Sequence, residues 1–342
     1  MKICFFRHSL FSRGGDKMVA EYANYLSSQG LKVTMLSNIV NTVFPVNVRI
    51  EPISRIKNKA GTILSAIFRE RDYDLIVADI IIMALLLSFR NRKKILYFAQ
   101  DYDESYYKYG IMKLFIRSAY YLGLRILKIP VIAVSVELGR LLEDRFSANV
   151  TVINNGVDPG IFFHEKKEEL LKQKGNGKVI LVFARSDHRK GFDRVKRILS
   201  GFENEIEQGK ISIWAVGEDI RVPFKMRNFG FVSSEELRWI LSSSDALLYP
   251  SRHEGLPLFV LEAMACGCPV VTTSAVHFIS DGVNGMVADD TEELAMKISE
   301  ILSNESLSFS IAKNAVELVK SKYSIEHSKE EFFRVIRSIS GK

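Results

Sequence analysis

Cysteine is scarce in this chain: Cys4, Cys266 and Cys268 are the only three in 342 residues. Three thiols cannot form a disulfide framework, which excludes the class of small, disulfide-stapled secreted domains. Cys266 and Cys268 also lack the C-x-x-C spacing of a zinc site, so we expect both to be small core residues. No basic start followed by an apolar run and a small-residue cleavage site precedes Phe5. We therefore expect a reducing, cytoplasmic location.

Long apolar runs are also missing. The most apolar stretch, residues 75–89, spans 15 residues and is interrupted by Asp79, whereas a membrane-spanning helix needs about 20. We expect no transmembrane segment. With 47% hydrophobic and 25% charged residues, the composition is that of a globular protein, and the length suits two domains of about 150 residues each.

Positive charge is concentrated in the first half. Residues 1–155 hold 22 Lys and Arg against 13 Asp and Glu, a net charge of +9, whereas the remainder holds 25 against 27, a net charge of −2. A basic half can bind nucleic acid, anionic lipid or a phosphorylated substrate, or it can be an ordinary solvated surface. Because no helix-turn-helix, RRM or zinc-finger pattern is present, we expect no nucleic-acid partner.

Short β-rich segments alternate with helical segments along the chain. Residues 2–6 form an apolar run, a polar loop passes through Gly14 and Gly15, a helical pattern runs from Asp16 to Gly30, and residues 32–37 are again β-rich. The further strand candidates are 74–79, 94–99, 131–135, 179–184, 211–216, 246–249, 270–273 and 285–288. This alternation predicts parallel sheets that are covered by helices on both faces and bind ligands at the carboxyl ends of their strands.

The amino-acid composition changes between Asn154 and Gly177, where Asn155-Gly-Val-Asp158 is followed by Glu- and Lys-rich sequence. We therefore predict an α/β protein with two Rossmann-like α/β/α domains that face each other across a cleft. The predicted parts are a first domain over residues 1–155, a linker over 156–177, a second domain over 178–322 and a C-terminal helix over 323–342 that packs back on the first domain.

The most distinctive segment runs from His253 to Val271. Pro257 suits the first position of a helix and Gly267 suits the residue just past its end, which predicts a helix of about ten residues. Glu254 precedes this helix and Glu262 lies inside it, so the two carboxylates face different parts of one ligand. The unpaired N–H groups at the helix start form an anion site, and a diphosphate with hydroxylated groups on either side would use all of these features. The residues alone leave open an ordinary β-loop-α unit with solvated acids.

Two common nucleotide-binding patterns are absent. No G-x-G-x-x-G follows the first strand, which argues against a nicotinamide dehydrogenase. No G-x-x-x-x-G-K-[ST] loop is present either, which argues against a P-loop enzyme.

Glu254 and Glu262 stand in a Glu-Gly-x-Pro…Glu-Ala-Met-Ala-x-Gly-x-Pro-Val-Val context. This context closely resembles the donor-binding signature of the family 4 retaining glycosyltransferases, which have the GT-B fold, and the resemblance extends over nearly the whole chain. It implies an enzyme that moves a sugar from a nucleoside diphosphate to a hydroxyl of a glycan or lipid-linked acceptor, in bacterial-type polysaccharide, lipopolysaccharide or glycolipid assembly. The first domain would then lie on the acceptor side, and the second would bind the nucleotide sugar.

The resemblance assigns roles to further residues. Arg185 and Lys190, in a segment similar to the family's Gly-Arg followed by Lys-Gly, would neutralise the donor diphosphate, because an Arg fork and a Lys charge stabilise a leaving group that gains negative charge. Ala184 replaces the family's usual glycine here. Glu254 would contact the transferred sugar, and Glu262 would accept hydrogen bonds from the ribose. The other donor-binding residues that the resemblance implies are Gly14, Gly15, Phe231, Val232, Gly255, Leu256 and Leu258, with the backbone of Phe231 and Val232 meeting the base.

The sequence departs from the family just after residues 94–99. Many members have a histidine here that contacts the donor sugar, whereas this chain has Gln100 and Asp101 on the acceptor side. A polar contact can survive this exchange, but an amide cannot carry a proton-transfer role.

The resemblance also implies a metal-independent reaction that needs no cofactor. Asp101-Tyr-Asp103 belongs to the first half rather than to a plausible donor loop, so Arg185, Lys190 and the helix start would replace Mg²⁺. Retention in this family is usually described as front-face attack, in which the leaving phosphate accepts the acceptor's proton and no enzyme nucleophile takes part. A non-catalytic protein that binds a sugar nucleotide or a polyanion is the alternative.

Residues 108–128 interleave cations with aromatic residues, a composition typical of a basic interfacial helix. Such a helix would place the protein at the inner face of the cytoplasmic membrane, on an anionic surface. A core helix with a basic edge is the alternative, because periodicity alone does not say whether the apolar face meets lipid or protein. The residues concerned are Lys108, Lys113, Arg117, Arg125, Lys128, Phe115, Tyr120 and Tyr121.

Overall fold

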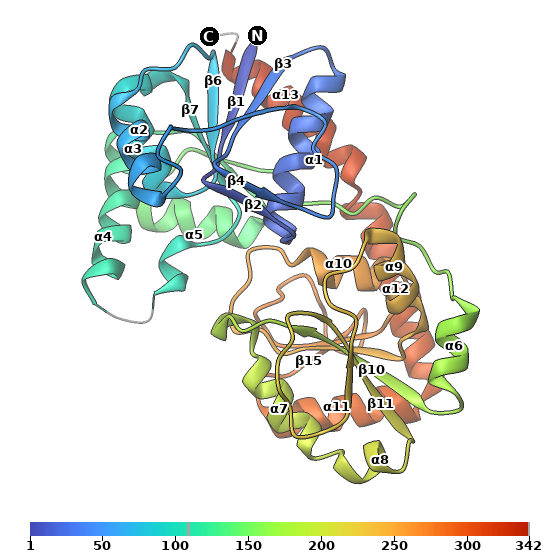
Figure 1. Cartoon of the computed structure of the whole chain (residues 1–342). Helices are drawn as coiled ribbons and strands as arrows, with labels where there is room; N and C mark the ends of the chain where they lie inside the picture. Colours follow the sequence, from blue (N-terminus) through green and yellow to red (C-terminus); the bar gives the residue numbers. More distant parts are fainter. Residues whose placement is uncertain (108–109, 341–342) are drawn as a thin grey trace. The chain divides into compact units, whose positions relative to one another are not determined.

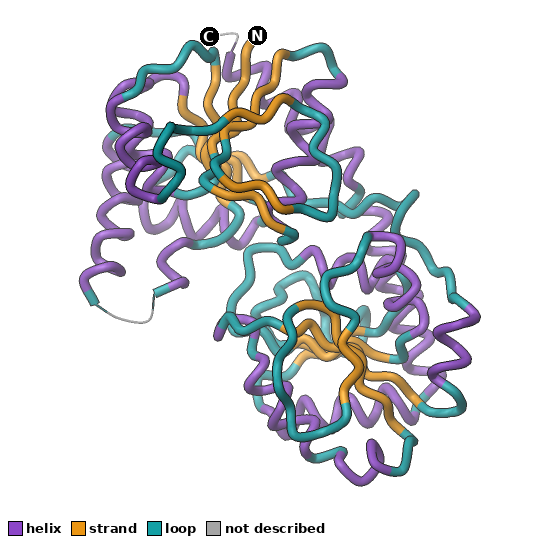
Figure 2. The backbone as a smooth tube through the Cα atoms, viewed as in Figure 1, coloured by secondary structure: helices purple, strands orange, loops and turns teal. Residues whose placement is uncertain are grey.

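The computed structural model describes residues 1–107 and 110–340, and it divides into two compact units (Figure 1). The first unit comprises Met1–Asn155 and Glu326–Lys342, and the second comprises Gly156–Ile325. Each unit is built on its own parallel sheet with helices around it, as Figure 2 shows. The two series of strands predicted from the sequence are present, one in each unit.

The first unit holds a seven-stranded sheet in the order β5-β3-β1-β6-β7-β8-β9. All five residues of β7 (Ile95–Ala99) are buried, as expected for a parallel strand that is covered on both faces. Its other strands are β1 (Lys2–Phe6), β3 (Lys32–Leu36), β5 (Arg49–Glu51), β6 (Leu75–Ala78), β8 (Val131–Ala133) and β9 (Val150–Val152), while β2 (Ser9–Phe11) and β4 (Ile39–Asn41) form a separate pair. The helical elements are α1 (Gly14–Ser28), α2 (Lys59–Phe68), α3 (Ile81–Asn91), η1 (Arg92–Lys94), η2 (Asp103–Tyr106), α4 (Ile111–Tyr120), the π-helical η3 (Tyr121–Ile126) and α5 (Val136–Phe146).

The C-terminal helix α13 (Ile325–Ser340) is grouped with the first unit from Glu326 onward. The ring of Phe332 stacks on Tyr22 with centroids 4.2 Å apart and meets Phe98 edge-on at 5.7 Å. Lys329 Nζ lies 2.7 Å from a carboxylate oxygen of Glu21 on α1. Buried aromatic contacts of this kind contribute strongly to packing, so α13 completes the core of the first unit.

The second unit holds a six-stranded sheet in the order β12-β11-β10-β13-β14-β15. Ser233 and Glu236 form a capping box: Ser233 Oγ accepts a hydrogen bond from the Glu236 N–H, and the Glu236 carboxylate accepts one from the Ser233 N–H. The strands are β10 (Lys178–Ala184), β11 (Ile211–Gly217), β12 (Met226–Asn228), β13 (Ala246–Tyr249), β14 (Val270–Thr272) and β15 (Met286–Val287). The helices are α6 (Glu168–Lys174), η4 (His188–Lys190), α7 (Phe192–Ser200), α8 (Glu203–Glu207), α9 (Ser234–Ser243), α10 (Leu258–Ala265), α11 (Thr291–Ser303) and α12 (Glu305–Lys322).

The segment 156–177, which the sequence suggests is a linker, is grouped with the second unit and contains α6. The backbone N–H of Glu165 donates to Ser242 Oγ at 3.0 Å, and Arg238 donates to the Ile161 carbonyl at 3.1 Å. The Nδ1 atom of His164 lies 2.9 Å from the carbonyl oxygen of Cys266. These polar contacts attach the segment to the surface of the second unit.

All three cysteines are buried free thiols, which confirms that Cys266 and Cys268 are core residues. Burial raises the pKa of the Cys4 thiol to about 12, so it stays protonated. Within residues 1–107 and 110–340, no helix combines the length and apolarity that crossing a bilayer requires. The same residues contain no cluster of three or more His, Cys, Asp or Glu side chains arranged to hold a metal ion.

Candidate functional site

Two loops of the second unit meet at one edge of its sheet. The strands β10 and β13 are parallel neighbours, with Val182 opposite Leu248, so the loops that leave their carboxyl ends lie side by side. One loop carries Arg185 and Lys190, and the other carries Glu254. The edge formed by the carboxyl ends of parallel strands is where open α/β sheets bind ligands.

Gly191 allows these loops to approach each other closely. Its φ is +69°, and a Cβ atom there would overlap the carbonyl oxygen of Pro250. The carbonyl of Arg189 accepts hydrogen bonds from the Arg252 N–H at 2.6 Å and from Ser251 Oγ at 2.8 Å. The Lys-Gly pair in the sequence therefore has a structural reason: the glycine lets the backbone carrying Lys190 lie against the Glu254 loop.

Lys190 and Glu254 form a close, shielded ion pair. Lys190 Nζ donates to the two carboxylate oxygens of Glu254 at 2.9 and 2.7 Å. Glu254 Oε1 also accepts hydrogen bonds from Tyr249 OH at 2.8 Å and from Ser251 Oγ at 2.6 Å. The carboxylate side chain is only 5% exposed. Three donors thus hold this carboxylate, and it in turn fixes the position of the ammonium group.

Tyr249 contacts Glu254 directly, although the sequence analysis assigns it no role. It lies at the end of β13, and its side chain is buried. Burial, together with the charge of Glu254, raises the pKa of its hydroxyl well above the ordinary value, so it remains a donor. The signal available in the sequence is the Tyr-Pro-Ser that ends at Ser251, three residues before the glutamate.

Arg185 follows β10 directly and makes different contacts from Lys190. Its Nε lies 3.1 Å from a carboxylate oxygen of Glu218. Its guanidinium lies 5.8 Å from the ring centroids of Phe183 and Phe231. Phe231 is therefore next to Arg185, and its ring is half-exposed.

The helix α10 starts one residue later than predicted. Pro257 is its N-cap, with φ −75° and ψ 105°, rather than its first helical residue, because its backbone is still extended. Gly267 has φ +71°, which confirms its position just past the helix end. All eight residues of α10 are buried, including Leu258 and Glu262. Gly255 and Leu256 lie in the loop between Glu254 and the helix.

The predicted residues of the first unit meet at the start of α1. A Cβ atom on Gly15 would lie 2.6 Å from Oε1 of Gln100, so a larger residue would have to displace this amide. Gln100 Nε2 donates to Asp79 at 3.1 Å, and Asp79 forms an ion pair with Arg7. Arg7 Nε also lies 2.5 Å from the buried carboxylate of Asp16. No local pattern in the sequence links Arg7, Asp16 and Asp79 to this site.

The remaining predicted residues have simpler surroundings. Gly14 is the first residue of α1. Asp101 accepts a hydrogen bond from the N–H of Tyr102, which directs its carboxylate toward the backbone. Val232 is partly buried in the loop before α9.

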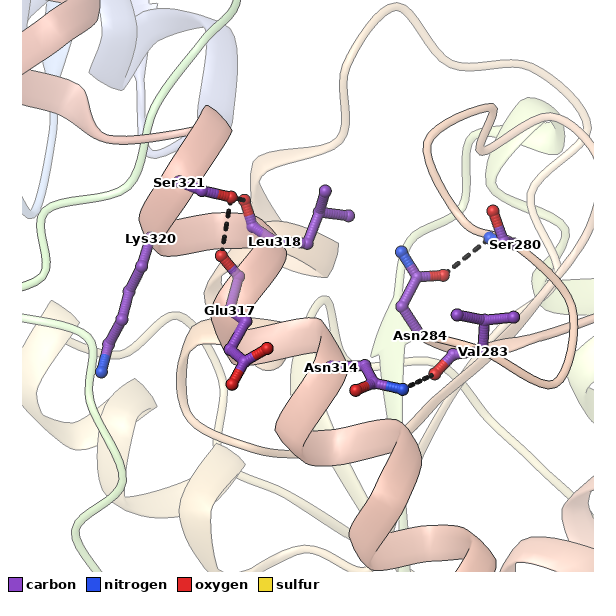
Figure 3. Close-up of a pocket in the computed structure, with 8 residues that line it drawn as sticks. All are labelled: Ser280, Val283, Asn284, Asn314, Glu317, Leu318, Lys320 and Ser321. Carbon is purple, nitrogen blue, oxygen red and sulfur yellow. Dashed lines mark hydrogen bonds between the residues drawn. The ribbon is translucent and has the colours of Figure 1, made fainter.

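A surface pocket of about 730 Å³ lies elsewhere on the second unit, between α12 and the loop of residues 280–284 (Figure 3). Asn284 Oδ1 accepts from the Ser280 N–H at 2.6 Å, and Asn314 Nδ2 donates to the Val283 carbonyl at 2.9 Å. These amides already have backbone partners, and the pocket is lined by none of the predicted donor residues. We therefore place the candidate site at the loops that carry Lys190 and Glu254.

Comparison with known proteins shows which family part of the chain matches. Residues 177–304 match the family model described as glycosyl transferases group 1. An uncharacterized glycosyltransferase of Methanocaldococcus jannaschii is 28% identical over 210 residues, which is 55% of this chain and 54% of that protein. A lipopolysaccharide core biosynthesis glycosyltransferase of Rhizobium meliloti is 25% identical over 177 residues, 47% of this chain and 50% of that protein. The chain thus spans about half the length of these curated relatives.

Solved structures extend the likeness of fold to the whole chain. The Anabaena protein HepE, determined in complex with UDP-glucose, has a TM-score of 0.80 at 19% identity, and the match covers 99% of this chain and 100% of that one. The architecture is therefore the GT-B fold, as predicted. Residues 177–304 thus match the group 1 glycosyltransferases, and the whole chain shares the fold of the solved structures.

Proposed function

We propose that this protein is a retaining, metal-independent glycosyltransferase that moves a sugar from a nucleoside diphosphate to an acceptor hydroxyl. The observation that carries the proposal is the Lys190–Glu254 pair, held at the carboxyl edge of the second sheet beside the start of α10. This position combines a positive charge held in place, a shielded carboxylate and a helix start, which together suit a sugar diphosphate.

In the proposed ligand-bound state, the donor diphosphate shares Lys190 with Glu254. The ammonium group has three donors and can bridge a carboxylate and a phosphate oxygen at once. Arg185 would offer its planar fork to the same diphosphate, with Phe231 beside it. Glu254 then shares Lys190 with the diphosphate, so its carboxylate can also accept a hydrogen bond from a hydroxyl of the sugar.

In the proposed chemical step, no group of the protein forms a covalent bond or takes up a proton. A lone pair of the acceptor oxygen forms the new bond to the anomeric carbon, and the electron pair of the old bond leaves with the diphosphate oxygen. That oxygen takes up the proton released by the acceptor hydroxyl. Lys190 and Arg185 stabilise the negative charge that develops on the diphosphate, which is the contribution usually made by fixed charges in such sites.

Other predicted residues complete the proposed donor site. Glu262, buried in α10, would accept hydrogen bonds from the ribose, and the backbone of Phe231 and Val232 would meet the base. On the acceptor side, Gln100 would supply a polar contact in place of the family's histidine. The names of the relatives, which include a lipopolysaccharide core glycosyltransferase, support a role in lipopolysaccharide, polysaccharide or glycolipid assembly.

A thermal-shift screen followed by a transfer assay tests the proposal. The full chain is heated with UDP, GDP, ADP and dTDP sugars in EDTA, because a ligand that binds only the folded state raises the unfolding temperature. A donor that stabilises the protein is then supplied with a labelled sugar and candidate acceptors, and the anomeric configuration of the product is read by NMR. Stabilisation without any release or transfer of sugar would favour the non-catalytic alternative. Transfer that requires Mg²⁺, or that inverts the anomeric centre, would refute the proposed mechanism.

A further inference from the structure

The helix α4 and the π-helical turn η3 carry apolar side chains on both sides. Ile116, Ala119, Tyr120, Gly123 and Leu124 are buried against the first unit. A surface helix ordinarily presents polar residues on the side opposite its buried face. Here that side, which we call the outer face, instead carries the exposed large residues Ile111, Met112, Leu114, Phe115, Tyr121, Leu122 and Ile126.

The outer face is unusual in its density of exposed apolar groups. Ile111 is 82% exposed, Leu114 63% and Phe115 53%. Exposed apolar residues in the second unit, such as Met296 on α11 and Phe309 on α12, instead occur singly among polar neighbours. Isolated exposed residues are normal, whereas a contiguous group marks a surface that binds something.

The charges around the outer face indicate what it binds. Residues 111–128 include Lys113, Arg117, Arg125 and Lys128 but no Asp or Glu. Glu104, from η2, is buried beneath them, with its carboxylate 2.5 Å from Arg117 and 3.7 Å from Lys113. An apolar strip surrounded by excess positive charge matches an anionic lipid surface, in which phosphate groups overlie acyl chains. A second copy docking through the same face would bring like charges together, which opposes that arrangement.

The inner contacts of this segment fix its orientation. Tyr102 donates a hydrogen bond to Glu104, and Tyr120 OH accepts one from the Asp103 N–H at 2.9 Å. The ring of Tyr120 stacks on Phe146 of α5 with centroids 5.0 Å apart. The helix is therefore held by its inner face, and the outer face is presented without any refolding. Lys108, which the sequence analysis groups with these cations, lies outside the described residues.

We propose that the outer face of α4 and η3 is a membrane-docking surface that inserts apolar side chains into the headgroup region of an anionic bilayer. Arg125 and Lys128, at the end of the segment, would pair with lipid phosphates. This inference rests on the proposed function in one respect: a membrane-docked glycosyltransferase would naturally use a lipid-linked acceptor. Docking itself requires no catalytic turnover.

Vesicle flotation of the full chain tests the inference. The protein should float with vesicles of phosphatidylcholine and phosphatidylglycerol at low salt, and much less with phosphatidylcholine alone. Leu114→Ser with Phe115→Ser should lower partitioning about tenfold or more, because both apolar groups then leave the interface. Phe309→Ser removes a 73% exposed apolar side chain from the second unit, so it is the control and should leave partitioning unchanged. Arg125→Gln with Lys128→Gln should lower binding about tenfold on anionic vesicles and reduce its dependence on salt.

Insertion is distinguished from surface adhesion by a tryptophan reporter. Both native tryptophans, Trp214 and Trp239, lie in the second unit, so Phe115→Trp adds a signal at the outer face. Its emission should shift to shorter wavelength on anionic vesicles and be quenched by brominated acyl chains. Absence of vesicle binding, equal binding by the Leu114→Ser and Phe115→Ser variant, or a concentration-dependent dimer that this variant abolishes would each overturn the inference. Nucleotide-sugar binding and transfer to a soluble acceptor are measured without vesicles, so failure of docking would leave the proposed function standing.

Discussion

The two units differ in how their apolar and charged side chains are distributed between surface and interior. Among the described residues, twenty of the exposed large apolar side chains lie in the first unit and six in the second. Residues 1–155 carry a net charge of +9, and the rest of the chain carries −2. The second unit instead has a shielded, hydrogen-bonded pair of charges at its sheet edge. The second unit thus holds its distinctive charges in a shielded pair, whereas the first exposes apolar and basic side chains at its surface.

Glu254→Gln should disrupt the shielded charge pair of the second unit most strongly. The amide keeps the shape of the side chain but loses the charge that holds Lys190, so kcat should fall about a hundredfold. The affinity for the free nucleoside diphosphate should remain equal or rise, because Lys190 becomes free to bind phosphate. Steady-state kinetics and calorimetry separate the two effects. A parallel loss of kcat and diphosphate affinity would argue that Glu254 does not face the sugar.

Substitution of one glycine in each unit compares how much stability each unit loses when a Cβ atom is added. Gly191→Ala forces a Cβ against the backbone carbonyl of Pro250 at a φ of +69°, so it should lower the free energy of unfolding by about 1–3 kcal/mol. Gly15→Ala in the first unit meets the movable side chain of Gln100 and should cost less. Urea unfolding of both variants gives the two values. Equal or reversed costs would contradict the rigid approach of loops described for the second unit.

A pair of tyrosines tests whether Tyr249 positions the site. Tyr249→Phe removes one hydrogen bond to Glu254 and should lower kcat about tenfold with little change in diphosphate affinity. Tyr97→Phe is the matched control, because Tyr97 OH is also buried and bonds Tyr120 OH at 3.0 Å, but in the first unit. That variant should lose similar stability and keep its kcat. If both variants lost activity in proportion to their stability, the role of Tyr249 would be structural only.

The smallest expected effect concerns Asp193, which pairs with Arg252 at 2.6 Å and attaches the Glu254 loop to α7. The hydrogen bond from Arg252 lowers the pKa of Asp193 to about 2 from its ordinary 3.8. The folded state therefore gains stability above pH 4, and this gain is lost as pH falls through the folded pKa. Because the carboxylate is more than half exposed, Asp193→Asn should cost only about 0.2–1 kcal/mol at neutral pH. A variant whose cost did not shrink between pH 5 and pH 2 would show that the charge is not responsible.

The sequence was sufficient for the main strands and for the motif around Glu254, because buried parallel strands are continuous apolar runs and the motif is long. It was insufficient for edge elements such as β5 and β12, which are three residues long and leave no period to detect. The pairing of Lys190 with Glu254, 64 residues apart, depends on the neighbouring positions of β10 and β13, which no local pattern encodes. The apolar outer face of α4 was also undecided, since only burial tells an outer side chain from an inner one.

Lys190→Ala tests whether a lysine held by Glu254 stabilises the departing diphosphate. Transfer of a labelled sugar from the donor found by thermal shift is measured in EDTA for the wild type and the variant, with circular dichroism to confirm folding. We expect the wild type to transfer sugar and Lys190→Ala to slow transfer at least about a hundredfold while weakening diphosphate binding. A folded Lys190→Ala protein that transferred sugar at the wild-type rate would contradict this role of Lys190.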